Sequence, residues 1–135
     1  NHDTILEPIS TKRNLEIEEY YSNQGYLFLH GDKLPENYGI QLKEIKAIIV
    51  GHEHPALGLK ERTRVERYKC FLKGNYKRKQ LIVLPSFNLV VEGSDVLKER
   101  LLSPLLPKDI GEMEVFIVAD KVYSFGKIKG LRKLR

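Results

Sequence analysis

The sequence predicts an α/β domain in which a few helices pack on a mixed β-sheet. Two short runs, Tyr26–Leu29 and Ala47–Val50, are apolar throughout, which is typical of strands buried on both faces. The segment between them is long enough for the crossover that joins two parallel strands. The second half of the chain is richer in strand-forming residues, so we expect further strands to extend the same sheet.

Size and composition indicate one folded domain over residues 1–135. The chain is 41% hydrophobic and 30% charged, and its longest apolar runs are of core-strand length, too short to cross a membrane. The single cysteine, Cys70, excludes an intrachain disulfide and favours a reducing compartment, so we expect a cytoplasmic protein. The net charge of +5 permits a polyanionic partner such as nucleic acid but does not require one.

The first half of the chain contains three predicted strands. Residues 15–21 form the first, and the polar residues 22–25 form the turn that follows it. The two apolar strands come next, joined by a short helical or irregular crossover over residues 42–46.

The second half contains four predicted strands, over residues 65–73, 80–85, 114–119 and 121–125. Gly74 and Asn75 predict one turn, and Asp120 predicts another. Residues 95–102 form a short predicted helix capped by Ser94, after which two prolines interrupt regular structure.

All four histidines fall in short motifs of the kind that build a metal site. His30 and His52 directly follow the ends of the two apolar strands, where open α/β sheets bind ligands, so we expect them at one rim. His54 lies two residues after His52 and would point to the same side of an extended segment, with Glu53 directed away into solvent. The fourth, His2, lies in Asn1-His2-Asp3. Because imidazole is the commonest protein metal ligand, the pattern predicts a metal site.

These motifs and their order resemble those of the calcineurin-like metallophosphoesterases, in particular the small archaeal phosphoesterases related to SbcD-type repair nucleases. That family carries the blocks D-x-H, G-D, G-N-H-D or G-N-H-E, a lone His after a strand, and G-H-x-H. Asn1-His2-Asp3 resembles the third block, His30 the fourth and Gly51-His52-Glu53-His54 the fifth. The first two blocks do not occur in residues 1–135. We therefore interpret the chain as the C-terminal portion of such an enzyme, starting at the third block and inactive in this form.

The resemblance implies a portion of a four-layer αββα sandwich, without its first strands, and a centre of two divalent metal ions. It assigns Asn1, His30 and His52 to one ion and His54 to the other. His2 would contact the phosphate and protonate the leaving group, and Asp3 would orient His2. Manganese is the first expectation, and mixed nitrogen and oxygen ligands also suit iron, zinc or nickel. The implied substrate is a phosphodiester or phosphomonoester, with nucleic acid among the candidates.

Two other functions stay open from the residues alone. The chain could be a nucleic-acid-binding module without turnover, or three imidazoles and one further ligand could hold a single structural zinc. Asp32 is interpreted as a residue that stabilises a turn or hydrogen-bonds to a residue that binds the metal. Cys70 is interpreted as a small core residue. No membrane contact is expected, and the pattern does not determine the oligomeric state.

Overall fold

The computed structural model describes residues 5–61 and 63–133. Its strands are β1 (Tyr20–Asn23), β2 (Tyr26–Leu29), β3 (Ala47–Val50), β4 (Pro55–Glu61), β5 (Arg64–Tyr76), β6 (Lys79–Val83), β7 (Ser94–Asp95), β8 (Glu114–Val118) and β9 (Val122–Lys127). Its helices are α1 (Leu6–Arg13), the 3-10 helix η1 (Pro35–Tyr38) and α2 (Ile128–Arg132). None of the helices in these described ranges is long and apolar enough to cross a membrane.

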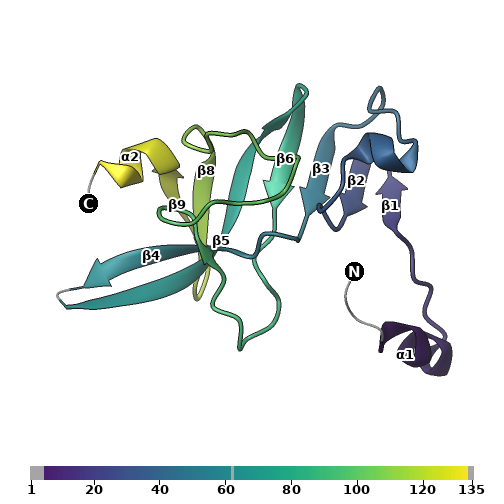
Figure 1. Cartoon of the computed structure of the whole chain (residues 1–135), viewed down its shortest axis with the longest axis horizontal. Coiled ribbons are helices and arrows are strands. Elements are labelled where there is room, and N and C mark those ends of the chain that lie inside the picture. The colour runs from purple at the N-terminus through teal and green to yellow at the C-terminus, as the bar shows by residue number, and fades with distance from the viewer. Residues whose placement is uncertain (1–4, 62, 134–135) are drawn as a thin grey trace.

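The strands form one mixed sheet, as the sequence predicts (Figure 1). The strand order is β1-β2-β3-β6-β5-β4-β7, while β8 pairs with β5 and carries β9 on its other side. Strands β2, β3 and β6 run parallel to one another, which confirms the predicted crossover between the two apolar strands. Their carboxyl ends therefore meet at one edge of the sheet.

A row of buried apolar side chains crosses five neighbouring strands. Successive register pairs join the members of this row, none of which is more than 7% exposed: Leu29, Val50, Val83, Leu72 and Val115. The first three are the last residues of β2, β3 and β6. The row is thus the layer of core directly beneath the histidines. It packs the ends of the strands that precede them against the central strands of the sheet.

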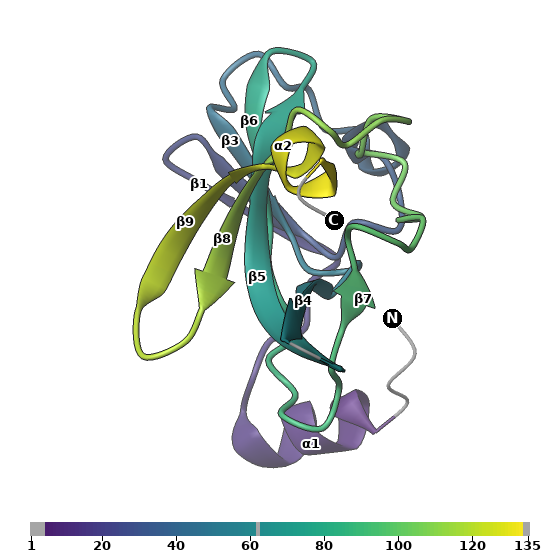
Figure 2. The same ribbon diagram turned by 90° about the vertical axis from the view of Figure 1, so that its left-hand side faces the viewer.

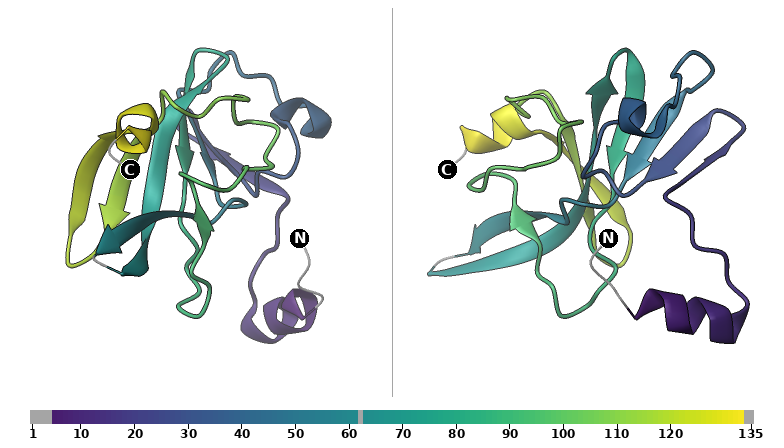
Figure 3. Two further views of the ribbon diagram at one scale, coloured as in Figure 1. Left: turned by 60° about the vertical axis from the view of Figure 1, so that its left-hand side comes forward. Right: turned by 45° about the vertical axis from the view of Figure 1, so that its right-hand side comes forward.

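The sheet is covered mainly on one face. Helix α2 and the irregular segment between β7 and β8 lie on the same side of it (Figure 2). Side chains from these segments join the sheet residues in one hydrophobic core, including Leu105, Ile110, Met113 and Ile128. Helix α1 buries no residue and stands away from the sheet (Figures 1 and 3).

The predicted strand over residues 15–21 is wrong in most of its length. Strand β1 begins only at Tyr20, because Tyr20 pairs with Leu29, the last residue of β2. The turn is also shorter than predicted and consists of Gln24 and Gly25, both with positive φ, which suits a tight hairpin. Strands β2 and β3 have the predicted bounds, and the crossover is irregular over residues 42–46.

Two further predictions in the second half are wrong. Gly74 and Asn75 lie inside β5, and the turn to β6 is made by Lys77 and Arg78 with positive φ. The helix predicted over residues 95–102 does not form, and only residues 96–98 make a turn after β7. The Asp95 carboxylate accepts hydrogen bonds from the backbone N–H groups of Leu97 and Gly58 and holds the chain beside β4. Strand β4 was not predicted at all.

Candidate metal centre at the histidine rim

His30 and His52 meet at the carboxyl ends of β2 and β3. The backbone N–H groups of Gly51 and His52 both donate to the His30 carbonyl, at 3.0 and 2.9 Å. This brings His52 Nδ1 to 2.9 Å from His30 Nε2, with the rings edge to face at a centroid distance of 4.8 Å. The sequence prediction that these two side chains converge at one rim therefore holds. We refer to His30, His52 and His54 as the histidine rim.

The separation of the two ring nitrogens suits a shared metal ion. Nitrogen ligands bind transition metals at about 2.0–2.1 Å, so neighbouring ligands of one ion lie roughly 3 Å apart. The 2.9 Å between His30 and His52 also suits a hydrogen bond in one tautomeric arrangement. The distance alone is therefore compatible with a shared ion or with a direct hydrogen bond between the rings.

His54 does not lie on an extended segment, contrary to the expectation from its spacing. Residues 52–53 form a turn, and His54 has a left-handed backbone with φ of 48°. Its carbonyl accepts a hydrogen bond from the Ser94 N–H at 2.9 Å. His54 is the smallest of the causes that lower the pKa of His30, and the convergence of its ring with the other two stays a prediction. Residues with a left-handed backbone are sparse in proteins and gather at functional sites.

Burial is the main cause of a lowered pKa at His30. The charge of His52 lowers that pKa further, while the carboxylate of Asp32 acts in the opposite direction. The His30 imidazole is therefore neutral at physiological pH, which is the form that binds metal. The role predicted for Asp32, in a turn or bonded to a metal ligand, stays a prediction.

Glu53 is buried, so the prediction that it is solvated was wrong. Only 7% of this residue is exposed. Its Oε1 accepts hydrogen bonds from the backbone N–H groups of Leu102, at 2.8 Å, and of Ser103. The Ser103 hydroxyl in turn donates to the Gly31 carbonyl at 2.5 Å. The turn at residues 52–53 makes this possible, because it directs Glu53 inward instead of alternating it outward.

Glu53 and Ser103 together form a latch between the two histidine loops. One end of the latch is Glu53, between His52 and His54, and the other is Gly31, directly after His30. Sequence reasoning did not find this role for either residue. The only local signal is an acidic residue between two histidines, and its partners lie about fifty positions away in the chain.

The remaining predicted site residues lie outside the described residues: Asn1, His2 and Asp3. Within residues 5–61 and 63–133, no group of three or more His, Cys, Asp or Glu side chains is arranged to hold a metal ion. Metal binding by His30, His52 and His54, and the roles of Asn1, His2 and Asp3, thus stay predictions. Cys70 is fully buried in β5, and its burial raises the pKa of the thiol to about 12, so its predicted core role is confirmed.

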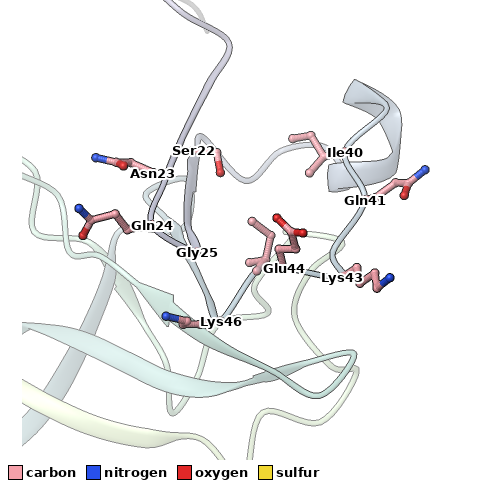
Figure 4. Close-up of a pocket in the computed structure, with 10 residues that line it drawn as sticks. Ser22, Asn23, Gln24, Gly25, Ile40, Gln41, Lys43, Glu44 and Lys46 are labelled. Atoms are coloured by element: carbon pink, nitrogen blue, oxygen red, sulfur yellow. The ribbon is translucent and has the colours of Figure 1, made fainter.

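A polar pocket of about 810 Å³ lies at the other edge of the parallel strands (Figure 4). It is lined by Gly25 and Lys46, the residues just before β2 and β3, together with Gln41 and Glu44. Ligands of open α/β sheets bind beyond the carboxyl ends of the strands, and this pocket lies at the amino ends. A smaller groove of about 380 Å³ does contain His30, with Gly51 and Leu84 from the neighbouring strands.

Comparison of the chain with models of protein families, with curated proteins and with solved structures gives no match.

Proposed function

We propose that this protein is a metal-dependent phosphoesterase that hydrolyses phosphodiester or phosphomonoester bonds with a dinuclear metal centre. The observation that carries the proposal is the 2.9 Å contact between His30 and His52 at the carboxyl ends of two adjacent parallel strands. The motif order that resembles the calcineurin-like metallophosphoesterases supports it. In that fold, the mixed sheet of this chain would be part of a four-layer αββα sandwich.

Each site residue has a distinct proposed role. His30, His52 and Asn1 hold one ion, and His54 binds the second. The ions, manganese or alternatively iron, zinc or nickel, supply charge neutralisation at the phosphate and acidify water. His2 contacts the phosphate and gives its proton to the leaving oxygen, while Asp3 orients the His2 ring. The proposed location is the cytoplasm, and nucleic acid is the candidate polymeric substrate.

Metal dependence is the first test. The protein is expressed from its complete gene, so that any residues encoded ahead of Asn1 are present, and assayed on bis(p-nitrophenyl) phosphate. Activity should require added manganese and disappear in a chelator, because the motifs supply no protein nucleophile. Full activity in the chelator contradicts the proposal.

Two histidine variants separate metal binding from proton donation. His52→Ala should lose metal and activity together. His2→Ala should keep its metal and lose about 10²–10⁴-fold in turnover, the usual effect of removing a general acid. Metal analysis and kinetics are run on both variants. A His2→Ala protein that loses its metal while His52→Ala keeps it would reverse the assigned roles.

The same preparation distinguishes the other two functions. One equivalent of zinc, whose removal unfolds the protein, would instead identify a structural site. Salt-dependent binding of nucleic acid without any metal-dependent hydrolysis would identify a binding module.

A further inference from the structure

The segment between β6 and β7 carries large apolar side chains almost entirely exposed to solvent. Phe87 is 101% exposed, Leu89 93% and Val90 89%. We call residues 85–93 the apolar loop. A single exposed apolar side chain is ordinary on a protein surface, but three within four residues mark a contact site.

The topology places both ends of the apolar loop beside the histidine rim. The loop leaves β6, the third parallel strand, and Leu84 donates its N–H to the Val50 carbonyl at 2.7 Å, just before Gly51. It returns at Ser94, whose N–H donates to the His54 carbonyl at 2.9 Å. The loop therefore starts beside Gly51 and ends beside His54, and so brackets the segment that contains His52 and His54.

The backbone of the apolar loop is held in place by polar side chains. Lys69 of β5 donates to the carbonyls of Ser86, at 2.8 Å, and of Asn88. Arg67 donates to the Gly93 carbonyl at 2.9 Å, and the Asn88 side chain accepts the Val90 N–H at 2.9 Å. The loop is thus ordered at both ends while Phe87 projects outward. Because the backbone is already fixed, a ligand that covers Phe87 has little loop entropy to overcome.

We infer that Phe87 stacks on the nucleobase of a nucleotide or oligonucleotide whose phosphodiester occupies the histidine rim. This inference rests on the proposed function, and it names the substrate class. In the proposed function the ions held at the rim bind the anionic phosphate, and the apolar loop that starts and ends beside the rim provides a flat ring for the organic group. Aromatic side chains bind bases of any sequence because every base presents a π-face.

The test uses the absence of tryptophan from residues 1–135. Phe87→Trp places an indole on the loop, and its emission is measured as the difference from the unsubstituted protein expressed from the same complete gene. The probe is a short oligothymidylate with hydrolysis-resistant phosphorothioate linkages. Stacking should quench the indole emission saturably. Dimethyl phosphate, a phosphodiester without a ring, should leave the emission unchanged.

Tyr26→Trp is the matched control. Tyr26 is also an exposed aromatic residue, at 48%, but it begins β2 and so lies at the opposite end of that strand from His30. Its indole should not respond to the oligothymidylate. Equal quenching in both variants would show non-specific contact and overturn the inference.

Phe87→Ala supplies a second measurement. It should weaken oligothymidylate binding by about 5- to 150-fold, the loss expected for one stacked base, with metal content and the urea midpoint unchanged. Unchanged affinity overturns the inference. So does an indole in Phe87→Trp that becomes buried with rising protein concentration and no nucleotide, since a second copy would then cover the loop.

The two proposals fail in different ways. A protein that hydrolyses phosphodiesters with metal, but whose Phe87 variants show none of these changes, keeps the proposed function and loses this inference. A protein without metal-dependent hydrolysis loses the proposed function, and the fluorescence measurement then decides nucleotide binding alone.

Discussion

The parallel and antiparallel parts of the sheet use polar side chains in opposite ways. Beyond the parallel strands β2 and β3, polar groups are buried and bonded across long sequence separations, as in the contact of Glu53 with Leu102. Around the antiparallel pair β8 and β9, polar groups are exposed and form ion pairs, such as that of Glu112 with Lys127 at 2.9 Å. Exposed ion pairs contribute little to stability, whereas a buried acceptor that loses its donors is costly. The polar groups whose positions are fixed by burial and hydrogen bonding therefore lie at the carboxyl ends of the parallel strands.

The two parts nevertheless share one core, and the largest predicted effect comes from breaking it. Leu72 is fully buried in β5 and pairs with Val83 of the parallel part and Val115 of the antiparallel part. Leu72→Ala should lower the free energy of unfolding by about 2–5 kcal/mol. Urea unfolding monitored by circular dichroism measures this. Val122→Ala, at a half-exposed position, should change it by less than about 0.5 kcal/mol. Equal effects in the two variants would contradict the shared core.

The next largest effect should come from the latch at the histidine rim. Glu53→Ala leaves the N–H groups of Leu102 and Ser103 without their acceptor, which should cost about 1–3 kcal/mol of stability. It should also weaken metal binding by about 10–100-fold, since groups that orient ligands have effects of that size.

Glu53→Gln is the matched control for the latch, because its amide oxygen can still accept these hydrogen bonds. Calorimetric titration with manganese is performed on both variants of the protein from the complete gene. If Glu53→Ala binds manganese as tightly as the unsubstituted protein, the latch does not position the histidines.

A smaller effect is predicted within β5. An added methyl group at Gly74 would come within 2.9 Å of the Met113 Cε and 3.0 Å of its Cγ, so the flexible Met113 side chain must shift to make room. Gly74→Ala should therefore destabilise the protein by only about 1 kcal/mol. Thermal unfolding measures the change. Gly74 has no positive φ, so a much larger loss would show that Met113 does not move aside.

The smallest effect is predicted for Glu112, in the antiparallel part. Hydrogen bonds from Lys127 and then Lys129 lower its pKa to about 2, from an ordinary value of 4.5. A lowered carboxyl pKa adds stability above pH 4.5 that is lost as the pH falls towards 2. Glu112→Gln should therefore be slightly less stable than the unsubstituted protein at pH 7, and the difference should shrink as the pH falls towards 2. Melting temperatures at both values, at low and high salt, measure the difference. A gap that persists at pH 2 would exclude the ion pairs as its cause.

The local sequence was sufficient to predict the structure wherever a short apolar strand was followed by a histidine. Tyr26–Leu29 and Ala47–Val50 have the predicted bounds because a continuous apolar run leaves few alternatives to a buried strand. The parallel pairing followed from the length of the crossover, and the meeting of His30 and His52 followed from that pairing.

Sequence was misleading where a residue had a conformation that its tertiary partners imposed. Glycine and asparagine favour turns, yet Gly74 and Asn75 continue β5, since they pair with Leu81 and Gln80 of β6. Lys77 and Arg78 make the turn instead, with positive φ that their residue types do not favour. Pairing with β6 thus outweighed local preference.

The amino-acid sequence by itself determined the sheet class, the two central strands and the convergence of two imidazoles, because apolar periodicity and chain direction are local properties. Only the tertiary structure decided the inward turn of Glu53, its bonds to residues 102–103, and the placement of the apolar loop beside His54. These depend on contacts between segments separated by about forty to seventy positions, as in the bond from Ser103 to Gly31. Such contacts close long loops and depend on the packing of distant segments, so no local pattern encodes them.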